Sequence, residues 1–485
     1  MKVGIIGSGV AGLASAVRQA IKGHDVTVFE ANAYPGGKLS SFELEGYRFD
    51  AGPSLFTMPQ YVDELFELAG ENPRDHFNYQ RLDTVCHYFW DDGIRLQAHA
   101  EKGAFAKEAQ QKLGVAPEVV LQMLANSEQK FELTGSIFLE KSLHKASTWA
   151  DPKVVKTLMQ LPKLDLFTNM DRVHQRELKH PKLVQFFNRF ATYNGSNPYK
   201  APGLLSIIPH YEHHLGAYFP EGGMVEISNA IYQLAKRLGV DFQFNSPVDT
   251  IVVSNKVATG LMVKGEEHPF DRIISNQDVF FTYSKLLPNQ KAPERTLRQE
   301  KSSSAIIFYW GIKKSFPELD LHNIFFSKDY QTEFSNLAAG KVYEDPTVYV
   351  NISSKLAPND APQGHENWFT MINAPYNAGQ DWDYLIGKVR SATIRKVSRV
   401  LGVDLAELIT CEEILDPRSI ESKTGSHLGS LYGTSSNNKM AAFLRHPNFS
   451  RRIKHLYFCG GSAHPGGGIP LCLLSASIVD QVMKN

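Results

Sequence analysis

The sequence predicts an α/β fold whose first element is a buried parallel strand. Residues 3–6 form a short apolar run, and Gly7, Gly9 and Gly12 follow it in the order G-x-G-x-x-G. A second apolar strand over residues 25–29 ends at Glu30, about 20 residues after the glycines. Strand, glycines, helix, second strand and terminal acid together are typical of a Rossmann-like domain that binds a dinucleotide.

Each glycine of this turn has its own expected role. Gly7 permits the tight turn, Gly9 lets the backbone approach a pyrophosphate, and Gly12 lets the helix lie against the sheet. The helix that opens here presents free N–H groups to the phosphates, so we expect Ser8 and Ala11 to belong to the same binding turn. The alternative is a glycine-rich turn without function.

A second glycine-rich segment indicates which dinucleotide binds. Gly36 and Gly37 come soon after Glu30, and Gly52-Pro53-Ser54 follows them. An NAD enzyme has no physical need for this second segment, whereas FAD extends further and needs close backbone approach along its ribityl chain and ring. Lys38 would add a positive charge near the pyrophosphate or flavin. The alternative reading is a simple turn with a solvated lysine.

At this point the chain resembles a known family. E-x-x-x-x-P-G-G-K-x-x-S over residues 30–41 and F-D-A-G-P over 49–53 are similar to the amine-oxidase-type FAD superfamily, and more closely to the bacterial phytoene desaturase family of carotenoid desaturases. The segment G-x-x-x-H-P-G-x-G-I-P at 460–470 resembles the C-terminal flavin loop of that family. Further matching segments are 191–199, 218–224 and 322–330, so the resemblance covers nearly the whole chain.

The resemblance implies an enzyme that uses FAD. Residues 50–58 look most like the desaturases of 1-hydroxylated carotenoids, which implies 3,4-desaturation by hydride transfer to flavin N5. Position 38 is usually Arg in the superfamily, and Lys cannot form a bidentate fork. In the family, the residue that matches Val248 holds the adenine through its backbone, which implies the same role for Val248. The cofactor-binding residues expected in this way are Gly7, Ser8, Gly9, Ala11, Gly12, Glu30, Ala31, Gly37, Lys38, Gly52, Pro53, Ser54, Val248, Gly461, Gly468 and Ile469.

We do not expect a catalytic triad. A carbocation beside a polyene is stabilised by conjugation, so the main task of the protein is to hold the C–C bond against the flavin in a dry channel. His322 and His464 are candidate proton acceptors, and a purely structural hydrogen-bonding role is the alternative for both.

The motifs also predict how the chain is divided. We expect an FAD-binding domain from residues 1–70, 222–280 and 416–485, a helical, membrane-facing subdomain from 85–215, and a mixed-sheet substrate-binding domain from 281–415.

Several elements should lie within these units. We expect a helix that begins at Gly222-Gly223-Met224 and continues to Leu238, followed by a strand at 240–244. A hairpin is expected at 251–263, and a strand under the cofactor at 272–278. The continuous apolar run at 304–310 predicts a strand buried on both faces.

Composition limits the partners and the compartment. The 51 basic and 51 acidic residues give zero net charge, which argues against nucleic acid as a partner. The four cysteines lack CxxC spacing and are expected to be reduced in the cytoplasm. We expect no metal site, no signal peptide and no transmembrane helix. The oligomeric state is left open.

A carotenoid dissolves only in a membrane, so we expect peripheral attachment. The amphipathic stretch 154–167, with Lys153, Lys156 and Lys163 among apolar residues and a break at Pro162, is a candidate interfacial helix. A surface helix that packs on the core is the alternative.

Other functions remain open from the sequence. A phytoene desaturase, an amine or porphyrinogen oxidase, or a carotenoid isomerase would share the same FAD motifs. A non-enzymatic lipid chaperone similar to Rab GDP-dissociation inhibitors would not need the complete loop at 460–470, which argues against it.

Overall fold

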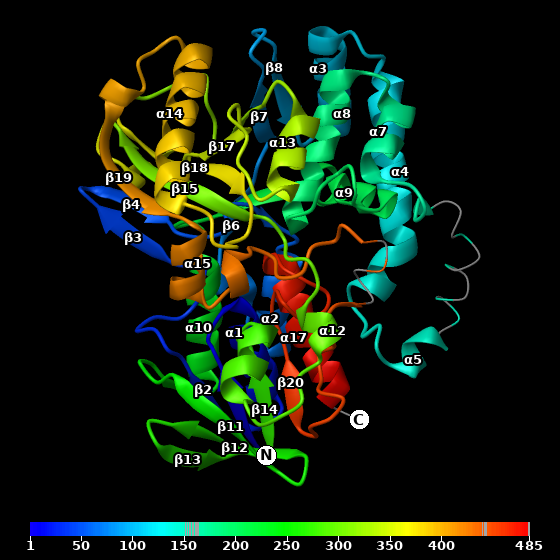
Figure 1. The fold of residues 1–485 in the computed structure, drawn as a ribbon, viewed down its shortest axis with the longest axis vertical. Helices are drawn as coiled ribbons and strands as arrows, with labels where there is room; N and C mark the ends of the chain where they lie inside the picture. Colours follow the sequence, from blue (N-terminus) through cyan, green and yellow to red (C-terminus); the bar gives the residue numbers. More distant parts are fainter. Residues whose placement is uncertain are drawn as a thin grey trace.

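The computed structural model describes the chain except residues 151, 153, 155–156, 158–159, 161–163, 439, 441–443 and 484–485. Its lower half in Figure 1 is built on a five-stranded parallel sheet in the order β10-β2-β1-β14-β20. These strands are Asp241–Gln243, Asp25–Phe29, Lys2–Ile6, Arg272–Ser275 and Leu456–Phe458. The predicted parallel sheet is therefore confirmed, and its strands come from three well-separated parts of the chain.

Three helices cover this sheet. They are α1 (Val10–Ile21), α10 (Glu226–Arg237) and α17 (Ile469–Met483), and their buried side chains form one core with those of β1 and β2. The α1 helix can lie this close because its buried side is rich in alanine, which adds little bulk between helix and sheet. The predicted hairpin is confirmed as β11 (Val248–Ser254) and β12 (Val257–Val263), and β13 (Glu266–Pro269) completes a three-stranded antiparallel sheet.

The upper half contains a seven-stranded mixed sheet in the order β19-β15-β18-β17-β16-β7-β8. The pair formed by β16 and β7 is parallel, and the other neighbours are antiparallel. Ser304–Ile312 is the predicted strand β15, and every one of its residues is buried. The other strands are β19 (Ile409–Leu415), β18 (Glu366–Ala374), β17 (Val348–Asn351), β16 (His322–Phe325), β7 (Thr84–Phe89) and β8 (Arg95–His99).

The two faces of this sheet differ. We call the outer face the side that carries Ile306, Phe308 and Trp310, which pack against helix α14 (Trp382–Leu401) in one closed core. The inner face carries the alternate residues, among them Ile307 and Tyr309, and packs partly against β4 (Tyr47–Asp50) of the β3–β4 hairpin (Ser41–Leu44 is β3). The inner face points toward the parallel sheet, because the Tyr309 hydroxyl donates to the carbonyl oxygen of Ala51 at 3.2 Å.

Helices fill the remaining corner of the upper half. Their core includes Phe105, Phe186 and Phe190 and continues onto β7 and β8. The helices are α3 (Lys102–Leu113), α4 (Pro117–Phe138), α7 (Met170–Leu178), α8 (Pro181–Asn188), α9 (Pro209–His213) and α13 (Tyr330–Ala338). The short helix α5 (Ala146–Trp149) follows α4 and lies lower, on the right of Figure 1. A small sheet, β5-β9-β6 (Phe56–Thr57, Ala217–Pro220, Tyr79–Arg81), joins the two halves.

Two sequence predictions concern this corner. Much of the predicted interfacial helix, including Lys153, Lys156 and Lys163, lies outside the described residues. Within the described part of the chain, no helix has the length and apolar character needed to cross a bilayer. The predicted domain boundaries stay predictions, and the structure adds that β7 and β8, at the start of the 85–215 segment, belong to the seven-stranded sheet.

Candidate functional site

The glycine turn between β1 and α1 has the geometry that the motif predicts. Gly7 has φ +89°, a conformation that favours glycine, and its N–H donates to the Phe29 carbonyl oxygen at 2.8 Å. A Cβ on Gly12 would overlap the carbonyl oxygen of Gly7, so only glycine lets the helix start this close to the turn. At Gly9 a Cβ would lie 2.7 Å from Oδ1 of Asn276. Ser8 and Ala11 are buried beside them.

Glu30 stands at the end of β2 against this turn. One carboxylate oxygen accepts hydrogen bonds from the N–H and hydroxyl of Ser8 at 2.7 and 2.8 Å. The other accepts from the backbone N–H and the amide of Asn32 at 2.9 and 3.0 Å. The Glu30 carbonyl oxygen accepts from the N–H of Ser246 at 2.8 Å, which brings the start of β11, and hence Val248, to the same edge of the sheet. Ala31 is exposed next to Glu30.

The second glycine segment closes over the first. The N–H of Gly36 donates to the Ser8 carbonyl oxygen at 2.8 Å, and a Cβ on Gly37 would lie 3.4 Å from the Cα of Gly9. A Cβ on Gly52 would overlap the carbonyl oxygen of Lys38, so the 36–39 and 50–54 segments cross in direct backbone contact. The predicted residues Gly37, Lys38, Gly52, Pro53 and Ser54 are therefore brought together with the β1–α1 turn.

Lys38 is turned inward and is not the solvated lysine of the alternative reading. Its ammonium group donates to the carbonyl oxygen of Leu431 at 3.1 Å. Burial lowers the pKa of Lys38, and the nearby carboxylate of Asp278 opposes this shift. Burial raises the pKa of Asp278, and the nearby Lys38 ammonium group opposes this shift.

The C-terminal loop adds a third set of glycines. Gly460 has φ +99°, and a Cβ there would lie 2.5 Å from the amide nitrogen of Asn276, the same side chain that lies against Gly9. Gly461 approaches Gly467, with 3.3 Å from a Cβ on the first to the Cα of the second. Gly468 (φ +112°) and Ile469 begin helix α17. Asn276 therefore joins the N-terminal and C-terminal glycine segments, a role that the sequence did not predict.

A buried arginine beside this loop was also missed. The guanidinium carbon of Arg445 would lie 3.0 Å from a Cβ on Gly466. Arg445 is 4% exposed, its guanidinium makes long hydrogen bonds to the Tyr432 carbonyl and the Ser436 hydroxyl at 3.4 and 3.5 Å, and burial lowers its pKa to about 10. Nothing in the local sequence marks it, because the residues around it carry no motif.

Asp50 connects the 49–53 segment with the 218–224 segment. Its carboxylate accepts from the N–H groups of Met224 and Val225 at 2.9 and 3.1 Å and pairs with Arg48 at 3.0 Å. A Cβ on Gly223 would lie 2.7 Å from the Arg48 guanidinium. The Asp50 carboxylate thus fixes the glycine turn at residues 222–224 beside the 49–53 segment.

The two candidate histidines lie in different places. His464 belongs to the C-terminal loop, where its Nε2 lies 3.0 Å from the Lys141 carbonyl oxygen. His322 is on the inner face of the seven-stranded sheet, with Nδ1 2.7 Å from the hydroxyl of Tyr349. That hydroxyl lies 2.7 Å from the hydroxyl of Ser54, so His322 is linked to the Gly52–Ser54 segment. Burial lowers the pKa of both histidines to about 3.

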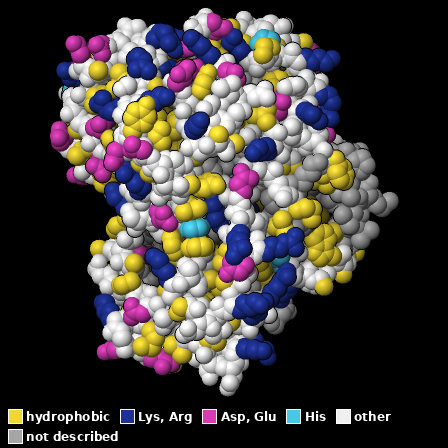
Figure 2. All heavy atoms as spheres, in the orientation of Figure 1, with side chains coloured by type: hydrophobic (Ala, Val, Ile, Leu, Met, Phe, Trp, Pro, Cys, Tyr) yellow, Lys and Arg dark blue, Asp and Glu magenta, His cyan; other side chains and the backbone are white. Residues whose placement is uncertain are grey.

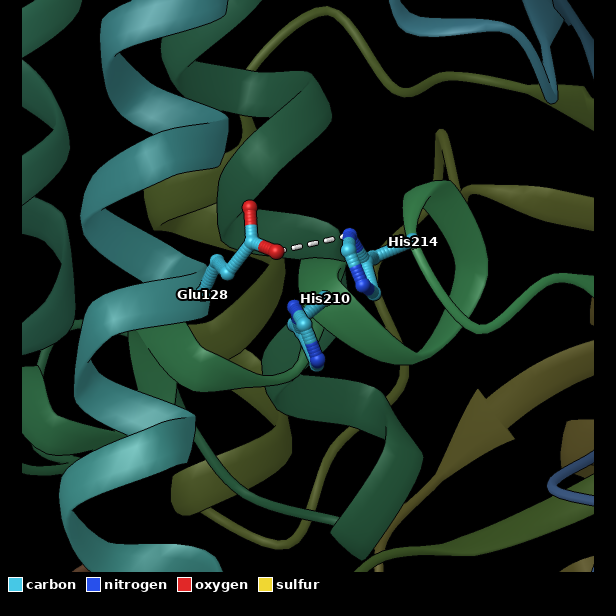
Figure 3. Close-up of side chains that lie close together, drawn as sticks. All are labelled: Glu128, His210 and His214. Carbon is cyan, nitrogen blue, oxygen red and sulfur yellow. Dashed lines mark ion pairs between the residues drawn. The ribbon is translucent and has the colours of Figure 1, made fainter.

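One cluster has the composition of a metal site and was not expected. Figure 3 shows Glu128 of α4 facing His210 and His214, which are four residues apart at α9. The sequence analysis expected no metal site and did not single out the four-residue spacing of His210 and His214. However, the ammonium group of Lys102 lies 3.0 Å from Glu128 and 2.8 Å from Nδ1 of His214, so a protein cation already fills the position between them.

An open groove lies elsewhere in the described part of the chain. It has a volume of about 1070 Å³ and lies between α7, α8, α13 and the end of β7, with Trp90, Asp171, Tyr199 and Asp329 among its lining residues. Its lining is largely polar and contains none of the glycine-segment residues. The groove is therefore separate from the site built at the edge of the parallel sheet.

The family can now be stated. The sequence profile described as "Flavin containing amine oxidoreductase" matches residues 10–479. The chain belongs to this family. It is an FAD-dependent oxidoreductase.

Similar proteins extend over the full length. The chain is 51% identical over 482 residues to a 1-hydroxycarotenoid 3,4-desaturase of Flavobacterium sp. (strain P99-3), covering 99% of this chain and 98% of the relative. It is 28% identical to a 4,4'-diapophytoene desaturase (4,4'-diaponeurosporene-forming) of Staphylococcus haemolyticus (strain JCSC1435), covering 100% and 98%. A putrescine oxidase variant has a similar structure, with a TM-score of 0.66, 16% identity and coverage of 100% and 98%, which shows a shared fold.

Proposed function

We propose that this flavin oxidoreductase introduces a C=C double bond into a carotenoid, and that its substrate is a 1-hydroxylated carotenoid desaturated between C3 and C4. The observation that carries the proposal is the 51% identity, over 99% of the chain, to the Flavobacterium desaturase. The inner face of the seven-stranded sheet supports it. Ile307, Phe369 and Met371 give that face an apolar surface next to the glycine segments, as a long hydrocarbon requires.

The residues at the parallel sheet fit FAD. Gly12 and Gly52 leave no room for a side chain, and Gly9 and Gly37 bring bare backbone together at the N-terminus of α1, where an anionic pyrophosphate is favoured. When bound, FAD supplies the hydride acceptor for the oxidation. We propose that it is held by Gly7, Ser8, Gly9, Ala11, Gly12, Glu30, Ala31, Gly37, Lys38, Gly52, Pro53, Ser54, Val248, Gly461, Gly468 and Ile469, with Asn276 and Arg445 as additions from the structure.

Glu30 has a specific requirement in this proposal. One carboxylate oxygen already accepts two hydrogen bonds from Ser8, and the other accepts two from Asn32. A carboxylate has about four lone-pair positions, so ribose hydroxyls can bind only by replacing the side-chain donors of Ser8 and Asn32. The two backbone N–H donors can stay, and they keep Glu30 aimed at the turn.

The remaining chemistry needs little from acid–base groups. A ring with a pKa of about 3 binds a proton weakly, so His322 and His464 are poor proton acceptors at neutral pH. We propose instead that the chain acts mainly by excluding water and by holding the polyene flat along the inner face.

We also propose peripheral attachment to the cytoplasmic face of a membrane. Phe167 and Trp149 are 82% and 36% exposed on either side of the residues that are not described. Figure 2 shows hydrophobic side chains beside Lys and Arg on the flank that carries α5. Aromatic and basic residues together favour an interface with anionic lipid. All four cysteines are free thiols, which suits a reducing compartment.

A flotation assay tests the attachment. Holoprotein mixed with anionic liposomes should rise with them, and Phe167→Ser should reduce the floating fraction without changing the visible FAD spectrum. Protein that stays wholly at the bottom of the gradient would contradict the attachment.

A substrate panel tests the reaction. FAD-loaded protein is incubated with liposomes that contain a 1-hydroxylated carotenoid, the analogue without the hydroxyl, or phytoene, and the products are identified by absorption and mass. Loss of two hydrogens from the hydroxylated compound, much faster than from phytoene, is expected. Faster conversion of phytoene would favour the alternative that this chain is a phytoene desaturase. The 28% identical relative is named a 4,4'-diapophytoene desaturase.

A further inference from the structure

A line of hydrogen-bonding groups crosses the inner face beside the glycine segments. The hydroxyls of Ser54 and Tyr349 lie 2.7 Å apart, and the hydroxyl of Tyr349 lies 2.7 Å from Nδ1 of His322. Strands β16 and β17 set this arrangement, because His322 stands opposite Asn351 and Tyr349 is two residues before it on the same face. Burial raises the pKa of Tyr349, so its phenol stays protonated.

Asn351 fixes the direction of this line. Its amide nitrogen donates to the Leu321 carbonyl oxygen at 3.1 Å and also lies 3.2 Å from Nδ1 of His322. An amide nitrogen can only donate, so Nδ1 must be the acceptor and the proton of the neutral ring must be on Nε2. Ser54 then donates to Tyr349, and Tyr349 donates to His322. Every atom of the line is satisfied except the last.

That last atom is a buried donor with nothing to bind. His322 is 3% exposed, and Nε2 has no hydrogen-bond partner within the part of the chain that the structure describes. A buried N–H without an acceptor costs free energy, on the order of 1–3 kcal/mol, so such a group indicates a missing partner. The partner must offer an oxygen lone pair and must be small or end in a small polar group.

The surroundings indicate that this partner is uncharged. Arg189 is a charged group that, after burial, helps to lower the pKa of His322, and its guanidinium is paired with the buried carboxylate of Glu212 at 3.0 and 3.2 Å. Nε of Arg189 also lacks a partner among the described residues. The pair is neutral overall, so it leaves no net charge to attract an anion.

The part of the inner face formed by Ile307, Phe369 and Met371 is apolar. Met371 and Tyr349 are only partly buried although they lie inside the molecule, whereas the outer face is closed. A ligand on this face would therefore be a hydrocarbon with one polar end near Ser54.

We propose that the N–H of His322 Nε2 binds the 1-hydroxyl oxygen of the carotenoid, and that Tyr349 and Ser54 are positioning residues that hold His322 in this tautomer. The inference rests on the proposed function, because it assumes that the substrate carries that hydroxyl.

The test compares two substrates in the wild type and in two variants. Wild type, His322→Phe and His322→Gln are loaded with FAD and assayed on the 1-hydroxylated carotenoid and on the analogue without the hydroxyl. His322→Phe should lower kcat/KM for the hydroxylated substrate about 10- to 100-fold, mainly through KM, and leave the analogue unchanged or improved. His322→Gln keeps an N–H donor and should recover part of the preference.

A matched control separates recognition from folding. His174 is equally buried, its Nδ1 bonds to Asn188 at 2.7 Å, and it lies on α7 away from the inner face. His174→Phe should lower stability without changing the substrate ratio. Tyr349→Phe removes one of the two donors to the Nδ1 of His322 and leaves Asn351 in place, so it should reduce the ratio to a smaller extent than His322→Phe.

The binding of product gives a readout that does not depend on turnover. Quenching of flavin fluorescence measures the dissociation constant for the hydroxylated product, which should rise in His322→Phe and stay unchanged in His174→Phe. If His322→Phe keeps the wild-type preference and affinity, the inference is overturned, and His322 binds a buried water. If wild type itself shows no preference for the hydroxyl, the proposed substrate fails first, so the two failures are distinguishable.

Discussion

The two large sheets of this protein build their sites in opposite ways. At the parallel sheet the binding surface is backbone, exposed because Gly9, Gly12, Gly37 and Gly52 have no side chains. At the seven-stranded sheet it is made of side chains on the inner face, with Tyr349 and His322 from neighbouring strands. A site of backbone tolerates almost no added atom, whereas a site of side chains changes its specificity with each residue.

This difference matches what each sheet must bind. A pyrophosphate is recognised by N–H groups and a helix N-terminus, which every sequence can supply once glycines let the chain come close. A long hydrocarbon has few polar atoms, so only the shape of the surface and one or two donors can distinguish it from its analogues.

The largest effect is expected at Gly12. Gly12→Val places atoms on the carbonyl oxygen of Gly7, which is backbone and cannot move aside, so we expect no folded holoprotein. Gly9→Ala is the matched control, because its Cβ meets only the side chain of Asn276, which can rotate. The control should fold and lose FAD affinity. Urea unfolding and the ratio of flavin to protein absorbance measure both effects, and a Gly12→Val protein with normal FAD content would refute the backbone site.

The next effect separates the faces of the seven-stranded sheet. Phe308 of the closed outer face is fully buried, so Phe308→Ala should lower the free energy of unfolding by about 3–5 kcal/mol. Met371→Ala on the inner face should cost less than half of this, because Met371 is only partly buried. It should instead raise KM for the carotenoid. Equal losses of stability in the two variants would contradict the open inner face.

A smaller effect is expected at Glu30. Glu30→Ala removes a carboxylate that accepts charge-assisted hydrogen bonds from Ser8 and Asn32, and the FAD dissociation constant should rise by a factor that corresponds to about 1.5–3 kcal/mol. Glu30→Gln keeps the shape and one acceptor, and should fall between the two. Fluorescence titration of apoprotein with FAD measures the change, and an unaltered affinity in Glu30→Ala would remove Glu30 from the site.

The smallest effect per side chain is the loss of folding stability in acid. It should be similar for His464 near the parallel sheet and for His322 on the seven-stranded sheet. Burial lowers the pKa of His322 and His464 to about 3, against about 6.5 in an unfolded chain. The unfolded state therefore binds more protons, and stability is complete above pH 6.5 and lost as the pH falls toward 3. At pH 5.5 each histidine should cost about 1.4 kcal/mol.

Urea unfolding at pH 7.5 and pH 5.5 checks this effect. His322→Gln and His464→Gln should each reduce the difference between the two pH values by a similar amount. A variant that keeps the full wild-type difference would show that its histidine is not buried in the neutral form.

The sequence by itself determined the nucleotide-binding half in detail. Strand β2 has the predicted bounds, the hairpin of β11 and β12 is where it was expected, and Gly7 and Gly12 have the predicted roles. These features depend on short-range sterics. A tight turn, a close helix and a buried strand leave their mark in neighbouring residues, so they can be read locally.

Only the tertiary structure decided the other half of the site. Strand β7 pairs with β16, more than two hundred residues later in the chain, and this pairing supplies the inner face. The line from Ser54 through Tyr349 to His322, the contact of Asn276 with two glycine segments, and the burial of Arg445 are likewise invisible in the sequence. The physical reason is that strand pairing uses backbone groups common to all residues. Which side chains meet is therefore fixed by the packing of the whole chain, and no local pattern records it.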